Sequence, residues 1–451
     1  MSFFEDDIPV FYASSPGRMD VMGGIADYSG SLLLQMPVKQ ITTVALQKRN
    51  DKRFELQSVT SGKKVKIFSI DVDLIRDKEP GEAGKIIRIQ PGGDWAAYVI
   101  GCFHVLQKEK GLMTNGASVR VSSTIPLGKG VSSSAALEVA TMHAICEAYQ
   151  LSLEATELAI LAQQAENLVV GSPCGLMDQL SVELGQKKKL LPLICQPCTV
   201  MQPVNIPKGI EFCGIDSGIR HAVSGASYSE VRAAAFMGYT IIAKGHGVTV
   251  KQLQKAKESN DWSLLPYRGY LANISVQDFE SKYEKLLPVS ITGKEFLDNF
   301  GISVDRVTSI DASKNYNVKA CARHPVFENS RVNSFLEHLK LFSKSAEKEK
   351  ELQQMGELMY QCHDSYSSVG LGNDHTDEII RMVKEAGVAS GVYGARITGG
   401  GSGGTVVILC YGKEGKETAK EIFHQYKKKY KKNIFFFQGS SQGASTINNT
   451  N

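Results

Sequence analysis

Residues 126–136 read Pro-Leu-Gly-Lys-Gly-Val-Ser-Ser-Ser-Ala-Ala, a stretch that follows a strand-like segment and opens a long helical pattern. Gly128 and Gly130 permit backbone conformations that other residues avoid, and the free amides and positive dipole end of a helix start favour anionic oxygens. The hydroxyl residues at this helix start are Ser132, Ser133 and Ser134. They can add hydrogen-bond donors and an oxygen ligand for Mg²⁺. The stretch predicts a phosphate-binding loop, although a serine-capped helix start without a ligand would have the same residues.

The composition is that of an ordinary globular protein. With 42% hydrophobic and 22% charged residues, the 451-residue chain is too long for one small core, so we expect two domains. The formal net charge of +4 is too small to indicate a nucleic-acid-binding surface. Residues 1–12 lack the apolar core of a signal peptide, and apolar runs such as residues 405–410 are too short to cross a bilayer. We therefore expect a cytoplasmic protein without nucleic-acid or membrane partners.

Strand-like and helix-like segments alternate along the chain, which indicates a mixed α/β protein. The strand-like segments are residues 41–47, 116–122, 190–194, 211–215 and 404–410. The helix-like segments are residues 95–108, 133–149, 153–169 and 228–243. Residues 251–331 are polar and weakly patterned, which predicts short helices and loops.

Three prolines between residues 196 and 208 interrupt any long helix, so we place a domain boundary there. We expect an N-terminal domain over residues 1–205 that binds ATP and sugar, a C-terminal domain over residues 206–438, and a flexible tail over residues 439–451, which have little to bury. The nine cysteines lack the regular spacing of a disulfide-rich domain, so we expect reduced thiols. Cys195 and Cys198 form a CxxC pair, but a zinc site would need a second such pair.

Two further glycine-rich motifs occur far from the loop. Residues 15–30 read Ser-Pro-Gly-Arg-Met-Asp-Val-Met-Gly-Gly-Ile-Ala-Asp-Tyr-Ser-Gly, and residues 394–404 read Gly-Ala-Arg-Ile-Thr-Gly-Gly-Gly-Ser-Gly-Gly. In this order, the three motifs resemble those of the GHMP kinases, and the loop resembles the galactokinase branch. The resemblance implies an α+β fold with an N-terminal domain like ribosomal protein S5 domain 2, a ferredoxin-like C-terminal domain, and the active site in the cleft between them.

Further residues match the galactokinase branch. They are Glu166, residues 173–179 (Pro-Cys-Gly-Leu-Met-Asp-Gln), Arg220, His221, Tyr228, Arg323, His324, Glu328 and Arg331. The resemblance implies that Asp178 accepts the proton of the attacking hydroxyl, and that Arg18 keeps this carboxylate ionised and neutralises the phosphoryl group. It also implies that Ser134 and Glu166 bind Mg²⁺ through oxygen atoms. Outside this context, Glu166 would be interpreted as a solvated helical charge and Asp178 as a helix cap.

The remaining site residues are also implied by the resemblance. ATP is expected to contact Gly128, Gly130, Ser132, Ser133, Ser134 and Ala135, with Trp95 near the adenine. An aromatic residue on a helix equally fits a place in the core. The sugar is expected to contact Gly24, Ile25, Asp27, Gly175, Asp178, Tyr228 and Gly400. We interpret Cys362, His363 and Asp377 as structural.

The first motif departs from that of galactokinases. They have Gly-Glu-His-Thr-Asp-Tyr, in which the Glu and His reach the C6 hydroxyl of the sugar, whereas this chain has Gly24 and Ile25 at those positions. L-Arabinopyranose is D-galactopyranose without the hydroxymethyl group, and a buried Glu and His left unpaired over a pentose would be costly. The altered motif therefore predicts a pentose substrate. Gly24→Glu combined with Ile25→His is expected to move the preference towards galactose.

The altered motif also resembles that of the kinase domain of plant-type L-arabinokinases, which are usually longer. So do residues 29–32, 35–37, 269–275, 356–363 and 398–405. We therefore expect ATP- and Mg²⁺-dependent conversion of L-arabinose to β-L-arabinose 1-phosphate. The alternatives are a galactokinase or another aldose 1-kinase, and a non-catalytic sugar sensor, against which the intact loop and carboxylates argue. ATP and a free monosaccharide would be the partners, and the oligomeric state stays open, a monomer included.

Overall fold

The structure is a computed structural model, and it describes residues 3–59, 66–172, 174–219 and 226–449. The chain forms two compact units. The first unit comprises residues 1–19, 36–191 and 439–451, and the second comprises residues 20–35 and 192–438. Strands β1 (Val10–Met22), β2 (Leu32–Lys48) and β6 (Lys189–Cys195) each continue from one unit into the other. The units differ from the expected domains because residues 20–35 belong to the second unit and residues 439–451 to the first.

Most strands of an eight-stranded sheet belong to the first unit. The strand order is β4-β3-β5-β2-β6-β7, with β1 paired to β2 and β8 paired to β6. The remaining strands are β3 (Arg53–Val59), β4 (Lys66–Asp71), β5 (Gly116–Ser123), β7 (Cys198–Val200) and β8 (Val204–Asn205). Strand β3 runs parallel to β5 with Phe54 opposite Ala117, and β2 runs antiparallel to β5 with Val44 opposite Val121. All four side chains are buried, so this register gathers core residues from three strands.

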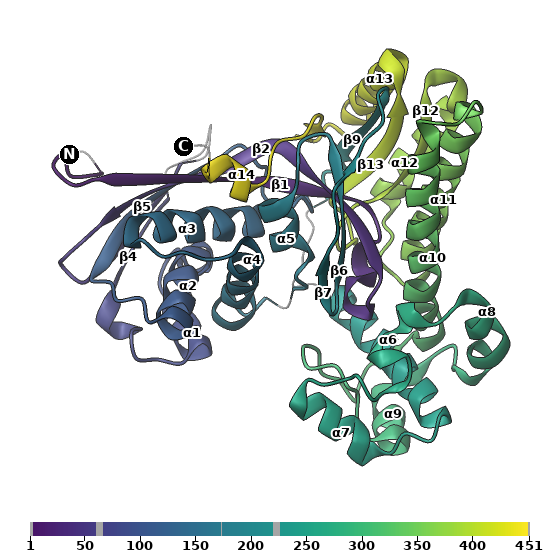
Figure 1. Ribbon diagram of the computed structural model, residues 1–451, viewed down its shortest axis with the longest axis horizontal. Coiled ribbons are helices and arrows are strands. Elements are labelled where there is room, and N and C mark those ends of the chain that lie inside the picture. Colours follow the sequence, from purple (N-terminus) through teal and green to yellow (C-terminus); the bar gives the residue numbers. More distant parts are fainter. Residues whose placement is uncertain (1–2, 60–65, 173, 220–225, 450–451) are drawn as a thin grey trace. The chain divides into compact units, whose positions relative to one another are not determined.

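The helices of the first unit lie beside these strands (Figure 1). They are α1 (Pro80–Arg88), α2 (Gly93–Lys110), α3 (Ser133–Tyr149), α4 (Ala155–Gln164) and α5 (Met177–Leu184), with the short turns η2 (Val72–Leu74) and η3 (Ala165–Val170), the latter π-helical. Phe103 of α2 packs on Phe54 of β3 with 4.8 Å between the ring centroids. Gly84 lets α1 approach η3, because a Cβ there would lie 1.9 Å from the carbonyl oxygen of Val169. This packing holds η3 in place.

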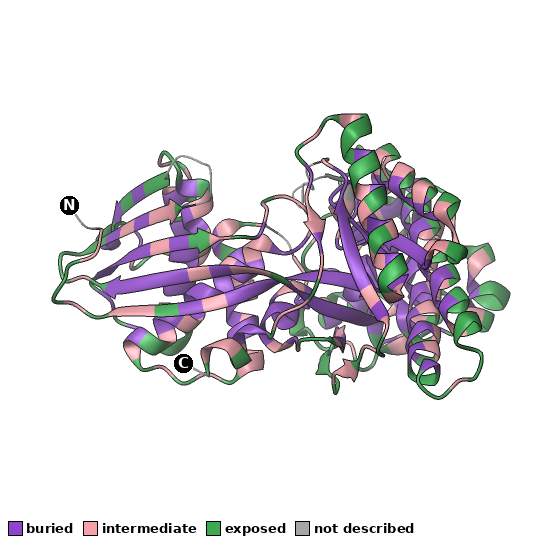
Figure 2. Ribbon diagram, turned by 90° about the horizontal axis from the view of Figure 1, so that it is seen from above, coloured by how far each residue is buried: buried purple, intermediate pink, exposed green. Residues whose placement is uncertain are grey.

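The second unit contains a four-stranded antiparallel sheet with the order β12-β13-β9-β14. Its strands are β9 (Ile210–Asp216), β12 (Val392–Ile397), β13 (Thr405–Tyr411) and β14 (Phe436–Phe437). Its long helices are α6 (Ala226–Gly245), α10 (Val318–Phe342), α11 (Lys348–Ser368), α12 (Asp374–Ala386) and α13 (Gly412–Tyr430). A Cβ on Gly356 would lie 2.0 Å from the carbonyl oxygen of Tyr393, so α11 packs directly on β12. Figure 2 shows these strands buried and the outer faces of the helices exposed.

The polar stretch before residue 331 is mostly short elements, as the sequence predicts. These are α7 (Val250–Ser259), η4 (Pro266–Gly269), η5 (Leu271–Asn273), α8 (Val276–Asp278), η6 (Phe279–Tyr283), η7 (Glu284–Leu286), β10 (Ile291–Thr292), α9 (Gly293–Phe300) and β11 (Asn315–Tyr316), with η8 (Val388–Ser390) near β12. The prediction of loops is wrong for residues 318–331, which form the first half of α10. Buried residues such as Cys321, His324 and Val326 anchor this half, and Pro325 lies inside it.

Residues 439–449 do not form the expected flexible tail. They include the short helix α14 (Ala444–Asn448), and Ala444 is buried. The amide of Gly443 donates to the carbonyl oxygen of Gly185 at 2.7 Å, and the Ser445 hydroxyl donates to that of Glu183 at 2.8 Å. Small and polar residues therefore attach this segment through hydrogen bonds and the burial of one alanine, which composition alone does not reveal.

Within the described ranges, no helix is long and apolar enough to cross a membrane. All nine cysteines are free, which agrees with the expectation of reduced thiols. Cys195 and Cys198 face each other across the β6–β7 hairpin without a disulfide.

Candidate functional site

The predicted phosphate-binding loop leads into the first turn of α3. Gly128, Gly130 and Ser132 have φ angles of 70°, 71° and 57°, so all three adopt the left-handed conformation. Ser132 is the N-cap residue, but its side chain does not cap the helix, and its buried hydroxyl has no partner among the described residues. The amide of Ala136 makes a helical hydrogen bond to Ser132. The amides before Ala136 are therefore available to anionic oxygens.

The first motif contacts this loop inside the first unit. The amide of Arg18 on β1 donates to the carbonyl oxygen of Val131 at 3.1 Å. A Cβ on Gly17 would lie 2.6 Å from the same oxygen, so glycine is required where β1 approaches the loop. The guanidinium Nη1 of Arg18 donates to the carbonyl oxygen of Gly130 at 2.7 Å. Arg18 is therefore fixed to the loop by both its backbone and its side chain.

Arg18 also binds Asp178, as the sequence leads us to expect. Its Nε and Nη2 atoms donate to Oδ1 of Asp178 at 2.9 Å and 2.7 Å. Arg18 is only 3% exposed, whereas the Asp178 side chain is 24% exposed. Leu176 is the N-cap of α5, so Asp178 lies inside the first turn and is not the helix cap. The pair places a carboxylate that is partly open to solvent beside the loop.

Glu166 is buried in η3 and does not lie on a solvated helix face. Its Oε2 accepts hydrogen bonds from Nε2 of Gln179 at 2.8 Å and from Sγ of Cys174 at 3.4 Å. Burial, followed by the nearby charge of Asp178, raises the pKa of Glu166 to about 7, against the opposing effect of hydrogen bonds that include one with Ser134. The two predicted Mg²⁺ ligands, Ser134 and Glu166, are therefore in contact.

Two residues beside Glu166 have no role in the sequence prediction, namely Glu138 and Gln179, although Gln179 ends the matched stretch 173–179. Nε2 of Gln179 donates to Oε2 of Glu138 at 3.0 Å as well as to Glu166, so one amide bridges two buried carboxyl groups. Burial and the charge of Glu166 raise the pKa of Glu138 well above its ordinary value. Glu138 lies one helical turn after Ser134, and Gln179 directly follows Asp178. This spacing could have identified both residues.

Gly175 lies half-buried in the turn before α5. This turn is anchored at its neighbour Cys174, whose amide donates to Oδ1 of Asn167 at 2.8 Å and whose carbonyl accepts from the Asn167 amide at 3.3 Å. Trp95, the residue expected near adenine, packs against the hydrophobic core of the first unit. These contacts fit the alternative interpretation of Trp95 as a core residue rather than a residue near adenine.

In the second unit, the residues expected to bind the sugar start with the helical turn η1 (Gly24–Ser29). Asp27 on this turn is buried. The next residue, Tyr28, packs edge-on against Tyr228 of α6 with 6.3 Å between ring centroids. Arg232, one turn further along α6, lies 5.6 Å from the centre of the Tyr28 ring and interacts electrostatically with Asp27. The structure therefore brings Asp27 and Tyr228 into one cluster.

Gly24, Ile25 and Gly400 are joined through a residue that the sequence did not indicate. Gly400 lies in the turn between β12 and β13, next to Gly399. The hydroxyl of Tyr366 on α11 donates to the carbonyl oxygen of Gly399 at 2.8 Å and accepts from the amide of Ile25 at 2.8 Å. No local pattern marks Tyr366, because its partners lie far away in the sequence.

The other matched residues of the second unit make structural contacts. Glu328 accepts hydrogen bonds from Nε of Arg331 at 2.7 Å and from the amide of Gly23 at 3.1 Å. His363 and Asp377 hydrogen-bond each other at 3.0 Å. Three motif residues, Pro173, Arg220 and His221, lie outside the described residues.

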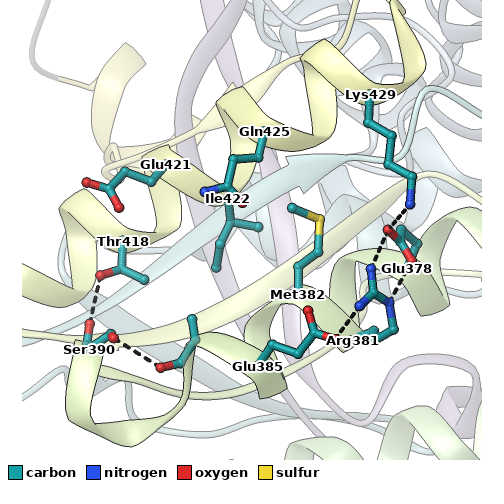
Figure 3. Close-up of a pocket in the computed structure, with 11 residues that line it drawn as sticks. Glu378, Arg381, Met382, Glu385, Ser390, Thr418, Glu421, Ile422, Gln425 and Lys429 are labelled. Atoms are coloured by element: carbon teal, nitrogen blue, oxygen red, sulfur yellow. Dashed lines mark hydrogen bonds and ion pairs between the residues drawn. The ribbon is translucent and has the colours of Figure 1, made fainter.

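A separate surface pocket lies between α12 and α13 (Figure 3). Most of its charged side chains are paired with one another, since Glu378 binds both Arg381, at 2.8 Å, and Lys429, at 2.5 Å. Arg381 also pairs with Glu385. None of the residues predicted from the motifs lines this pocket.

The fold is α+β, and a glycine-rich loop without a side-chain cap leads into α3. Two family descriptions match the chain, GHMP kinases N terminal domain over residues 97–186 and GHMP kinases C terminal over residues 342–432. The chain therefore contains the N-terminal and C-terminal domains of the GHMP kinases. The predicted two-domain fold with mixed α/β content is thereby confirmed.

Sugar kinases are among the similar proteins. L-Arabinokinase of Arabidopsis thaliana is 39% identical over 484 residues, which cover 96% of this chain and 46% of that protein, so the chain spans about half the length of this relative. Galactokinase of Chloroflexus aggregans is 29% identical over 404 residues, which cover 89% of this chain and 84% of that protein.

Solved structures share the fold. The structure of Lactococcus lactis galactokinase complexed with galactose matches with a TM-score of 0.73 and 20% identity, covering 98% of this chain and 96% of that one. Mevalonate kinase of L. major in complex with R-mevalonate matches with a TM-score of 0.55 and 15% identity, covering 97% and 98%.

Proposed function

We propose that this protein is an ATP-dependent kinase that phosphorylates the anomeric hydroxyl of a free monosaccharide. One observation carries this proposal: the loop before α3, with its uncapped helix start, is in direct contact with Arg18, which in turn holds Asp178. An anion-binding helix start beside a guanidinium and a carboxylate is the combination that phosphoryl transfer requires. The similarity to an L-arabinokinase and to galactokinases supports the same class of reaction.

The proposed reaction uses these groups in sequence. The anomeric oxygen of the sugar attacks the γ-phosphorus of ATP, and its proton passes to the Asp178 carboxylate. The bond from the γ-phosphorus to the bridging oxygen breaks, which releases ADP and the sugar 1-phosphate. Arg18 carries positive charge at the loop and offsets the negative charge of the phosphoryl group during transfer. The loop amides and the serines bind the phosphate oxygens.

We assign Mg²⁺ to Ser134 and Glu166. The two side chains are in contact and offer oxygen atoms, which suit a hard cation. In the described part of the chain, no cluster of three or more His, Cys, Asp or Glu side chains could hold a metal ion alone. Two protein ligands suffice for Mg²⁺, because this ion usually keeps waters and takes oxygens from the nucleotide phosphates. When bound, it supplies charge neutralisation for those phosphates.

We further propose L-arabinose as the preferred sugar. Asp27, Tyr228, Gly175 and Gly400 would contact its ring hydroxyls, while Gly24 and Ile25 provide no polar side chain for a hydroxymethyl group. The 39% identity to an L-arabinokinase supports this choice. D-Galactose remains the second candidate, because the chain is also similar to galactokinases along most of its length.

The direct test incubates the protein with ATP, Mg²⁺ and single free sugars, and follows both ADP release and the product by phosphorus NMR. A sugar 1-phosphate formed in equal amount to ADP is expected. Release of ADP without a phosphorylated sugar, or no reaction with any aldose, would contradict the proposal. The variant Asp178→Asn is the negative control, and Asp298→Asn, an exposed change on α9, is the matched neutral control.

A further inference from the structure

Gly24 has no space for a side chain. Its φ angle is 49°, in the left-handed region that favours glycine. A Cβ placed on Gly24 would lie 1.6 Å from the hydroxyl oxygen of Tyr366 and 2.8 Å from the Cζ atom of the same ring. It would also lie 2.8 Å from Nη2 of Arg396. The Tyr366 hydroxyl therefore occupies the place where a side chain on residue 24 would begin.

Tyr366 is held firmly in this position. The side chain is fully buried, and its hydroxyl bridges the Ile25 amide and the Gly399 carbonyl, with both hydrogen bonds 2.8 Å long. The guanidinium of Arg396 lies 5.1 Å from the centre of the Tyr366 ring. Arg396 is itself fixed by Oδ2 of Asp20 at 2.6 Å. Moving Tyr366 aside would break two buried hydrogen bonds. A larger residue at position 24 would therefore lower the stability of the folded protein.

We infer that Tyr366 is a specificity-determining residue, because its hydroxyl fills the space beside Gly24 and occupies the Ile25 amide, which closes this part of the sugar site to a hydroxymethyl group. This inference rests on the proposed function. It names the Tyr366 hydroxyl as the group that occupies the space left by the missing polar side chains of the first motif. Gly24 and Tyr366 depend on each other, because the position of the Tyr366 hydroxyl requires glycine at residue 24. The Ile25 amide would otherwise be a hydrogen-bond donor for a larger sugar.

This geometry corrects the expectation for Gly24→Glu combined with Ile25→His. The structure has no room for even the Cβ of a glutamate at residue 24 while Tyr366 is present. The double variant is therefore expected to be unstable rather than galactose-specific. A change of preference requires that Tyr366 be altered as well.

The packing part of the inference is tested by a double-mutant cycle with Gly24→Ala and Tyr366→Phe, read out as thermal unfolding of the protein without ligands. Any cost of the left-handed backbone at residue 24 occurs in both backgrounds, so it cancels in the cycle. Gly24→Ala is expected to lower Tm strongly in the wild-type background and clearly less in the Tyr366→Phe background, because the clash with the hydroxyl is gone. Equal losses of Tm in the two backgrounds would overturn the inference.

The specificity part is tested by the ratio of kcat/KM for L-arabinose to that for D-galactose. Tyr366→Phe is expected to lower this ratio about fivefold or more, because it removes the hydroxyl from this space and frees the Ile25 amide. Tyr426→Phe is the matched control, since Tyr426 is also buried and donates its hydroxyl to a backbone carbonyl, that of Ser217, at 2.8 Å. The kcat/KM ratio of Tyr426→Phe is expected to stay at the wild-type value.

The outcomes separate the two proposals. An active wild-type enzyme whose ratio is unchanged by Tyr366→Phe would overturn the role of Tyr366 and leave the kinase assignment intact. A wild-type protein that phosphorylates neither sugar would refute the proposed function, and the specificity role of Tyr366 with it. A lowered ratio in Tyr366→Phe but not in Tyr426→Phe would support the inference.

Discussion

Glu166→Gln is expected to stabilise the metal-free protein at alkaline pH while removing most of its kinase activity. Glu166 is buried, and its pKa in the folded protein is about 7 instead of the ordinary 4.5. This difference corresponds to about 3 kcal/mol, which the folded state loses when the buried carboxyl ionises. Glutamine carries no charge and avoids this cost. It also weakens the hydrogen bonds around residue 166, at a cost of about 1 kcal/mol.

The direction of the pH dependence of stability follows from the raised pKa of Glu166. Below pH 4.5 the carboxyl is protonated in both states, so Glu166 costs nothing. Between pH 4.5 and about 7 the unfolded chain ionises first, and the stability of the folded protein falls as pH rises. Above pH 7 the full cost is present. The advantage of Glu166→Gln should therefore grow by about 2 kcal/mol between about pH 5.5 and about pH 8.5.

The assay is chemical unfolding with a chelator present, followed by tryptophan fluorescence. The chain has two tryptophans, Trp95 in the first unit and Trp262 in the second. A Trp262→Phe background therefore reports the unfolding of the unit that contains Glu166. Glu147→Gln, an exposed change on α3, is the control and should bring no gain that grows with pH. The reasoning is refuted if Glu166→Gln is no more stable than its background at about pH 8.5, or if its advantage does not change with pH.

Three further predictions concern catalysis and folding. Asp178→Asn should lower kcat by about 10²- to 10⁴-fold while ATP affinity, measured by calorimetry, changes little, and near-normal turnover would exclude Asp178 as the base. Excess chelator should abolish activity and added Mg²⁺ should restore it, whereas full activity in chelator would exclude the proposed metal role of Ser134. Deletion of residues 439–451 should cost about 2–4 kcal/mol, because several hydrogen bonds to the first unit are lost. An unchanged Tm would contradict that attachment.

Local features of the fold could be predicted from the sequence because each has a short-range signal. The helical pattern over residues 133–149 coincides with α3 (Ser133–Tyr149), and the strand-like pattern over residues 211–215 lies within β9 (Ile210–Asp216). Both signals are local, since α3 is a long run of mostly buried helix-forming residues and β9 is a short run that is buried at all but one position. The glycine-rich loop was likewise visible, because the left-handed conformation of Gly128 and Gly130 demands that residue type.

Features that depend on distant pairs could not be predicted in this way. Residues 439–449 attach to the rest of the first unit through hydrogen bonds of small and polar residues, which leave no trace in composition. The bond between Tyr366 and the Ile25 amide joins residues 341 positions apart, and no pattern around Tyr366 points to this partner. The absent polar groups at Gly24 and Ile25 indicated a smaller substrate, but only the structure reveals what fills the space.

The most direct measurement is a competition assay with the wild-type enzyme, in which L-arabinose and D-galactose are mixed at equal concentration with limiting ATP and Mg²⁺. The two sugar 1-phosphates differ in mass, so mass spectrometry gives the ratio of the two specificity constants from one reaction. We predict an excess of L-arabinose 1-phosphate of about tenfold or more, as expected for a hydroxymethyl group without a partner in a closed site. A product that is mostly galactose 1-phosphate would contradict the pentose assignment, and no sugar 1-phosphate at all would contradict the kinase itself.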